Sequence, residues 1–287
     1  MSDATTFIQL RDPRSLALSK LAGGAFVAVV LFFLVLPTLI VIPISFGSAP
    51  YIEFPPSKLS LHWYTVFFND SDWIAAALFS LKIACLTAIS AVVIGTLAAV
   101  SLVRGDLPGK SFVLGLALGP MIVPQIIIAL ALYLFFSPLH LTGNLFGFLL
   151  AHTMLTVPYV VVSVSSSLEA FDPILEMAAL NCGAGRGRSF FEIVLPQIMP
   201  GIVTGAIFAF VSSFDEATIS FFISGDQGKT ITRKLFEDID FNLTPVIAVV
   251  STVIVLVSIG LMGAAHLAQK KRNRYARQRL TQICDPW

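Results

Sequence analysis

The stretch Pro173–Pro196, PILEMAALNCGAGRGRSFFEIVLP, is a polar, glycine-rich island between long uncharged segments, and the interpretation of the whole chain starts from it. Asp172, just before it, is a favourable helix N-cap, and proline in the first helical position sacrifices no hydrogen bond. We therefore predict a helix from Pro173 to Gly183, where glycine can adopt the left-handed conformation that closes a helix. One face of this helix is narrow and made mainly of small side chains: Leu175, Ala178, Ala179 and Cys182. Such a face suits close approach to a partner protein better than contact with lipid.

A second short helix is predicted after the glycine- and arginine-rich turn, over Ser189–Val194, and it leads to Leu195 and Pro196. The complete loop, 169–197, is far longer than the roughly two to eight residues usual between helices, and long loops are mostly functional or disordered. Because its periodicity indicates ordered helices, we interpret the loop as a docking element. An ordinary connector is the alternative.

The segments on either side of the loop indicate an integral membrane protein. Hydrophobic residues make up 56% of the 287 residues and charged residues only 12%, whereas about 25% charged residues is usual in soluble domains. A helix needs roughly 20 apolar residues to cross a bilayer. The uncharged runs that meet this length are Leu21–Ile52, Ile83–Val103, Ser111–Leu168, Ile193–Phe214 and Phe241–Gln269. The third run is long enough for two helices, with a turn at 137–144.

We accordingly predict an all-α membrane protein with six transmembrane helices in one domain, 21–268. It is preceded by a cytoplasmic segment, 1–20, and followed by a basic cytoplasmic tail, 269–287. The predicted transmembrane helices are 21–46, 76–103, 111–136, 145–168, 198–222 and 245–268. Basic residues collect on the cytoplasmic side of membranes, and placing both termini there puts thirteen of the eighteen Lys and Arg residues inside. The loop 169–197 is then cytoplasmic as well.

The loop resembles the coupling loop of bacterial ABC importer permeases. Their motif consists of Glu-Ala-Ala, three residues, Gly, nine residues and Ile-x-Leu-Pro. The positions of this sequence that match it in register are Ala178, Ala179, Gly183, Ile193, Leu195 and Pro196. Met177 stands where the motif has glutamate, and Glu176 precedes it, so the resemblance assigns the polar contact with the ATPase to Glu176. It implies a type I ABC importer permease fold whose loop, Ala184 included, docks into a cleft of the ATP-binding subunit.

Two further segments, Leu195–Ile202 and Ser213–Gly225, resemble the spermidine/putrescine branch of these permeases, and the likeness extends over nearly the whole chain. It implies a bacterial inner-membrane protein that passes a small cationic amine inward. Relatives for other small solutes, such as aminophosphonates and opine-like compounds, are the alternative. The implied partners are a homologous second permease, two ATP-binding subunits and a periplasmic substrate-binding protein that lands on 48–72 and 225–244. ATP and Mg²⁺ would belong to the ATP-binding subunits, so this chain would be a translocation subunit without cofactor and not an enzyme.

Two adjacent carboxylates, Asp215 and Glu216, lie within the predicted fifth transmembrane helix. An ionisable side chain at the centre of a membrane helix costs about 3 kcal/mol, so the pair needs a reason. Together with Ser212, one turn earlier, we interpret them as the lining of a substrate pathway for a cationic amine. Two structural alternatives stay open. The carboxylates could form an ion pair with Lys82 or cap a helix inside the bundle, or they could lie near the outer surface in contact with water.

Other chemistries find no support in the sequence. The segment Gly225–Thr230 lacks the glycine spacing of a phosphate-binding loop, and the histidines and cysteines have no metal-site or disulfide spacing. His152, in the fourth predicted transmembrane helix, is interpreted as a hydrogen-bonded packing residue, with a proton-relay or substrate role as the alternative. The competing class of function is an ion-coupled secondary transporter, which commonly has broken helices and paired carboxylates at its midplane site.

Overall fold

The structure is a computed structural model that describes residues 13–106, 108–225, 228–241, 244–260 and 263, with burial described from residue 20 onward. The described residues form mainly helices. In chain order these are α1 (Pro13–Ser45), α2 (His62–Asn69), α3 (Ser71–Arg104), α4 (Lys110–Ile122), α5 (Gln125–Phe136), α6 (Leu145–Glu169), α7 (Pro173–Asn181), α8 (Arg186–Ser189), the π-helical turn η1 (Phe190–Val194), α9 (Leu195–Phe214), α10 (Thr218–Ile223), α11 (Ile231–Phe241) and an apolar helix, Val246–Gly260.

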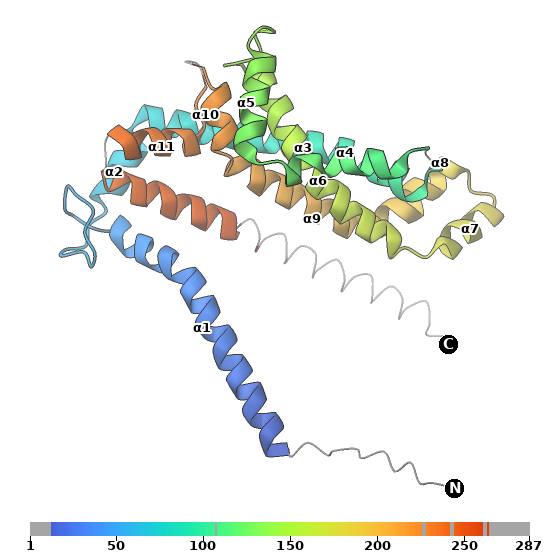
Figure 1. Cartoon of the computed structure of the whole chain (residues 1–287), viewed down its shortest axis with the longest axis horizontal. Coiled ribbons are helices and arrows are strands. Elements are labelled where there is room, and N and C mark those ends of the chain that lie inside the picture. The colour runs from blue at the N-terminus through green and yellow to red at the C-terminus, as the bar shows by residue number, and fades with distance from the viewer. Residues whose placement is uncertain (1–12, 107, 226–227, 242–243, 261–262, 264–287) are drawn as a thin grey trace, which may run out of the picture.

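Three long helices, α3, α6 and α9, lie side by side and form the centre of the molecule (Figure 1). Glycines allow their backbones to approach closely: a Cβ atom added at Gly205 of α9 would lie 2.9 Å from Cα of Val160 in α6. A Cβ atom at Gly95 of α3 would lie 2.7 Å from Cβ of the same valine. Because lipid is as apolar as a leucine side chain, this close packing rather than the hydrophobic effect holds membrane helices together.

Four helical stretches within the described residues are long and apolar enough to cross a membrane: Lys20–Ser45, Ser71–Arg104, Leu145–Glu169 and Arg186–Phe214. The bent pair α4 and α5 adds a fifth candidate. The predicted sixth transmembrane helix, 245–268, is described as Val246–Gly260, and most of its remainder lies outside the described residues. The class of an all-helical membrane protein is confirmed, while the count of six and the cytoplasmic side of both termini stay predictions.

The prediction of an unbroken third transmembrane helix, 111–136, is wrong. The helix stops at Ile122, and α4 and α5 meet at an angle of 104° across Val123 and Pro124. Pro124 has no backbone N–H to continue the helical hydrogen bonds, and proline disfavours the helical conformation for the residue before it. Val123 is accordingly extended, with ψ of 134°. Hydropathy alone does not register such a break, since both sides of it are equally apolar.

The predicted fifth transmembrane helix, 198–222, is interrupted near its C-terminal end, and it belongs to a longer helical stretch than the prediction gave. Its helix begins earlier, because α8, η1 and α9 form one continuous helical stretch from Arg186 to Phe214. It also ends earlier, at Phe214, and the short helix α10 follows after Ala217. The separate loop helix predicted over Ser189–Val194 is therefore part of the longer stretch Arg186–Phe214.

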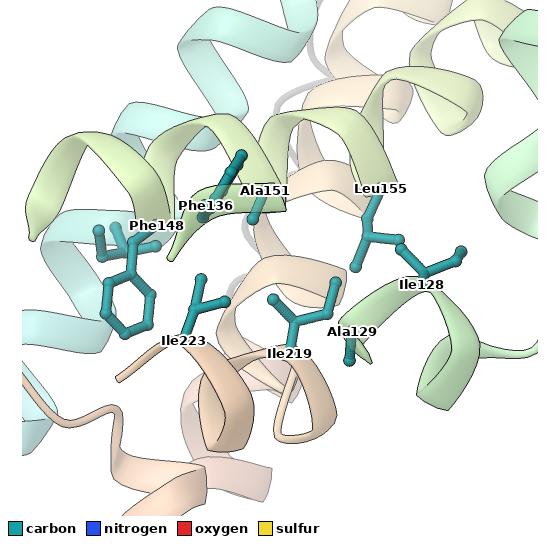
Figure 2. Close-up of a cluster of buried hydrophobic side chains, with 9 residues drawn as sticks. Ile128, Ala129, Phe136, Phe148, Ala151, Leu155, Ile219 and Ile223 are labelled. Atoms are coloured by element: carbon teal, nitrogen blue, oxygen red, sulfur yellow. The ribbon is translucent and has the colours of Figure 1, made fainter. Parts of the chain in front are cut away.

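The two segments that follow the breaks, α5 and α10, pack on each other and on α6 (Figure 2). The buried side chains between them and α3 are Ile83, Ile128, Ala129, Phe136, Phe148, Ala151, Leu155, Ile219 and Ile223. The backbone N–H of Gly143 also donates to the carbonyl oxygen of Ile223 at 2.7 Å, and Gly143 adopts the left-handed conformation with φ of 76°. These contacts join α5 and α10 into one packed unit.

The two ends of the bundle differ. The loop helices α7 and α8 lie at one end, and α2 and α11 lie at the other (Figure 1). At the α11 end, buried residues of α2, α3, α9, α11 and Val246–Gly260 form a common cluster. Helix α1 diverges from the bundle, and no residue of its most apolar window is buried against the chain (Figure 1).

Candidate functional site

A cavity of about 570 Å³ borders the break between α9 and α10. Its walls come from these two helices, α11, Val246–Gly260 and the first residue of α5. The polar residues that line it are Gln125, Ser212, Asp215, Glu216, Thr218, Thr232 and Ser251. The three residues predicted for the substrate pathway thus border a single cavity, although they lie at and beyond the end of a helix and not in its middle.

Glu216 is occupied by the protein itself. Its Oε1 accepts a hydrogen bond from the backbone N–H of Ile219 at 2.9 Å, and its Oε2 accepts one from Nε2 of Gln125 at 3.1 Å. The residue is only 6% exposed. Its carboxylate therefore satisfies an otherwise unpaired N–H in the first turn of α10 and ties that turn to the start of α5. This arrangement corresponds to the helix-capping alternative.

Asp215 is exposed and lines the cavity. In the part of the chain that the structure describes, its carboxylate accepts no hydrogen bond and forms no ion pair, in contrast to its neighbour Glu216. The proposed partner Lys82 is exposed on α3 and pairs with neither carboxylate among these residues. A carboxylate without a partner, lining a cavity, favours the arrival of a cation.

His152 lies behind the break, fully buried on α6. Its Nδ1 is 2.9 Å from Oγ of Ser213 in α9, and its Nε2 is 3.4 Å from Oγ of Ser220 in α10. The imidazole therefore links α6 to both sides of the break, and it does not line the cavity. The hydrogen-bonded packing role predicted for it agrees with this geometry.

Several cavity residues were not found by sequence reasoning. Thr232, Phe236 and Ser251 come from α11 and Val246–Gly260, and nothing in their local sequence marks them. Gln125 did carry a signal, because it is a polar residue directly after a proline in a long uncharged run. Proline lacks the N–H that continues a helix, so Pro124 was the available signal for a break at this place.

At the opposite end of the bundle, the first helix of the loop is confirmed. Helix α7 begins at Pro173, and Oδ1 of Asp172 accepts a hydrogen bond from the backbone N–H of Ile174 at 2.9 Å. Gly183 has φ of 88°, the left-handed conformation expected of it. Its neighbour Ala184 is partly exposed.

The remaining motif residues are divided between two helices. Ala178 and Ala179 lie on α7, exposed and partly exposed, beside the exposed apolar side chains Ile174, Leu175, Met177 and Leu180. Ile193 lies in η1, and Leu195 and Pro196 begin α9. The motif therefore joins the exposed helix α7 to a membrane-spanning helix without a break after Arg186.

Glu176 points back into the chain. Its Oε2 accepts a hydrogen bond from Nη1 of Arg104, the last residue of α3, at 2.6 Å. Among the described residues there is no cluster of three or more His, Cys, Asp or Glu side chains that could hold a metal ion.

The family described as "Binding-protein-dependent transport system inner membrane component" matches residues 91–273. The spermidine/putrescine transport system permease protein PotC of Haemophilus influenzae is 30% identical over 250 residues, which cover 87% of this chain and 97% of PotC. The putrescine transport system permease protein PotI of Escherichia coli is 34% identical over 238 residues, 80% of this chain and 84% of PotI.

Solved structures show the same fold. A chain of a bacterial ABC transporter involved in the import of the acidic polysaccharide alginate superposes with a TM-score of 0.71 at 12% identity, covering 89% of this chain and 98% of that one. A chain from the alginate transporter in complex with an alginate pentasaccharide-bound periplasmic protein gives a TM-score of 0.67, also at 12% identity, covering 90% of this chain and 96% of that one.

Proposed function

Because this chain belongs to the family of binding-protein-dependent transport system inner membrane components, we propose that it is the permease subunit through which an ABC importer admits a small cationic amine. The polyamine permeases among its relatives support the substrate class. Transport would be driven by ATP hydrolysis in a separate subunit.

The single observation that carries the substrate class is the free carboxylate of Asp215 in the cavity at the α9 break. Ser212, three positions earlier and near the end of α9, lines the same cavity. Ser251 adds a hydroxyl from the facing helix. A primary ammonium group has three N–H donors, and one carboxylate with two hydroxyls supplies three acceptors for it. Opine-like and phosphonate solutes also carry anionic groups, which Asp215 would repel.

The partners follow from the same proposal. The loop 169–197 would lie in the cytoplasm, where its exposed apolar helix α7 would dock on an ATP-binding subunit that holds ATP and Mg²⁺. A second permease would complete the pathway, and a periplasmic binding protein would deliver the solute to the end that carries α11. Supporting this orientation, α7 and α11 lie at opposite ends of the bundle (Figure 1).

Reconstitution in proteoliposomes with the second permease, the ATP-binding subunits and the binding protein tests this function. We expect uptake of labelled putrescine when ATP reaches the cytoplasmic face, and no uptake of 1,4-butanediol, which has the same carbon chain without charge. Uptake by this chain alone, driven by an ion gradient, would show a secondary transporter instead. Equal uptake of the diol would contradict a cation-selective pathway.

Replacement Asp215→Asn tests the site itself. Hydrogen bonds to charged groups are worth about 1.5–3 kcal/mol, so we expect the transport affinity for putrescine to fall about tenfold to hundredfold while the complex still assembles. The matched control is Asp106→Asn, which removes an exposed negative charge outside the cavity lining and should change affinity less than about twofold. Unchanged uptake by Asp215→Asn would remove this residue from the pathway.

A further inference from the structure

We propose that Arg104 and Glu176 are a pair of positioning residues that fix the loop helix α7 to the end of α3, so that movement of α7 is passed to the wall of the cavity. Glu176 then serves the coupling from inside the chain rather than by touching the ATPase. This inference rests on the proposed docking role of the loop 169–197.

The pair is short and sheltered. Nη1 of Arg104 lies 2.6 Å from Oε2 of Glu176, and each side chain is only 26% exposed. The guanidinium carbon of Arg104 also lies 5.0 Å from the centre of the Phe171 ring. Phe171 is 8% exposed and belongs to the buried cluster between α3, α6 and α9. Arg104 is thus held against the core on one side and holds the loop helix on the other.

Each charge sits at the helix end that favours it. Arg104 is the last residue of α3, where the partial negative charge of the helix dipole attracts a cation. Glu176 lies in the first turn of α7, where the partial positive charge attracts an anion. Because the two side chains are sheltered from water, salt screens their attraction less than it would screen an exposed pair.

Besides this pair, α7 is oriented by its packing on α8 and η1, at the start of the stretch Arg186–Phe214. Helix α7 contains nine residues, and isolated helices shorter than roughly 12–15 residues are only marginally stable in water. In the part of the chain that the structure describes, no other side-chain hydrogen bond or ion pair joins α7 to a membrane-spanning helix. Its apolar side chains Ile174, Leu175 and Met177 are exposed, so they do not anchor it to the bundle.

The helix on the other side of the pair reaches the cavity wall. Helix α3 continues without a break from Arg104 to Ser71. Near that far end, Oγ of Ser80 accepts a hydrogen bond from the backbone N–H of Ile231 at 2.8 Å. Ile231 begins α11, which lines the cavity with Thr232 and Phe236. One continuous helix therefore contacts α7 at one end and the cavity wall at the other, which gives a contiguous route along which movement can pass.

The native cysteines allow a direct test of the pair. Cys85 on α3 and Cys182 at the end of α7 are both free and exposed. With Cys284→Ser to remove the third cysteine, spin labels on these two report the distance between α3 and the loop in the assembled complex, built with cysteine-free partners. We expect a narrow distribution that shifts when ATP is added. Arg104→Gln and Glu176→Gln should each broaden it and abolish the shift, while Arg104→Lys, which keeps the charge, should stay close to the native distribution.

A charge exchange separates positioning from docking. In Arg104→Glu combined with Glu176→Arg, the attraction returns although both helix dipoles oppose it. We therefore expect at least half of the measured spin-label distances to fall within the native range again. The amount of amine transported per ATP should fall at least about fivefold in the single variants and recover in the exchange, with the ATPase bound throughout.

Native distributions in both single variants would overturn the inference. So would loss of ATPase binding in Glu176→Gln without recovery in the exchanged pair, since Glu176 would then contact the ATPase directly. The distances can also be measured in the chain without the ATPase, so the test of the Arg104–Glu176 pair does not depend on ATPase binding. A native chain that binds no ATPase would contradict the proposed function and not the positioning of α7 by this pair.

Discussion

At the scale of single residues, two neighbouring carboxylates have different tasks. Asp215 and Glu216 differ by one methylene group, yet Glu216 accepts two hydrogen bonds within the protein, whereas Asp215 accepts none among the described residues. The difference arises from direction, because adjacent positions at a helix end point about 100° apart. A chemical role therefore belongs to the position in the fold and not to the residue type.

Stability measurements distinguish the two carboxylates. Glu216→Ala leaves the N–H of Ile219 and the amide of Gln125 without their acceptor, and we expect a loss of about 1–3 kcal/mol in the free energy of unfolding. Asp215→Ala removes a side chain without such partners and should change it by less than about 0.5 kcal/mol. Thermal unfolding in detergent measures both. Equal losses would show that Asp215 is structural as well.

A second residue-scale prediction concerns two glycines of the loop. Gly183 has φ of 88°, which strains any residue with a Cβ atom by about 1–2 kcal/mol, although nothing lies within 4 Å of that atom. Gly185 has an ordinary φ of −70° and equally open surroundings. We expect Gly183→Ala to reduce co-purification of the ATP-binding subunit and Gly185→Ala to leave it unchanged. If both variants bind alike, the closing turn of α7 does not shape the docking surface.

At the scale of elements, the breaks in two helices create the site. Pro124 ends α4, and the capping of α10 by Glu216 begins a new helix after Phe214. Both breaks were missed from the sequence, because hydropathy and periodicity are similar on their two sides. The first helix of the loop was predicted correctly, since its cap, proline and closing glycine all act within a few residues.

Helix α11 is predicted to respond to acid. Glu237 is partly buried, which opposes its ionisation, yet hydrogen bonds from Lys229 and Arg233, both at 2.9 Å, lower its pKa below the usual glutamate value. The lowered pKa means that ionised Glu237 stabilises the fold at pH values above the usual glutamate pKa. This stabilisation is lost as the pH falls through the lowered pKa. We expect amide hydrogen exchange in α11, corrected for intrinsic rates, to accelerate in that range.

Glu237→Gln is the control for this response. In this variant, amide hydrogen exchange in α11 should be faster than in the native protein already at neutral pH, and acidification should not accelerate it further. If the native protein and the variant respond to acid alike, another group controls α11.

At the scale of the whole molecule, close contact of α3, α6 and α9 holds the bundle together. A Cβ atom at Gly205 would lie 2.9 Å from Cα of Val160, a backbone atom that cannot move aside alone. Overpacking of this kind costs about 1–3 kcal/mol. We expect Gly205→Ala to lower the melting temperature of the purified chain. Gly115→Ala, on α4 with nothing within 4 Å, should leave it unchanged or raise it slightly.

The sequence by itself determined the membrane class, the helical content and the loop that resembles a coupling element, because hydropathy, caps and motif spacing all depend on residues close together in the chain. It also identified Ser212, Asp215 and Glu216 as candidates. The family assignment then rested on comparison with other proteins.

Only the tertiary structure decided which carboxylate is free and where Glu176 points. Gln125 reaches Glu216 across 91 positions of the chain, and Arg104 reaches Glu176 across 72. The cavity likewise takes its walls from α5, α9, α10, α11 and Val246–Gly260. Hydrogen bonds and ion pairs act over a few ångströms of space, so the partner of a side chain is decided by how distant segments pack and not by the residues beside it.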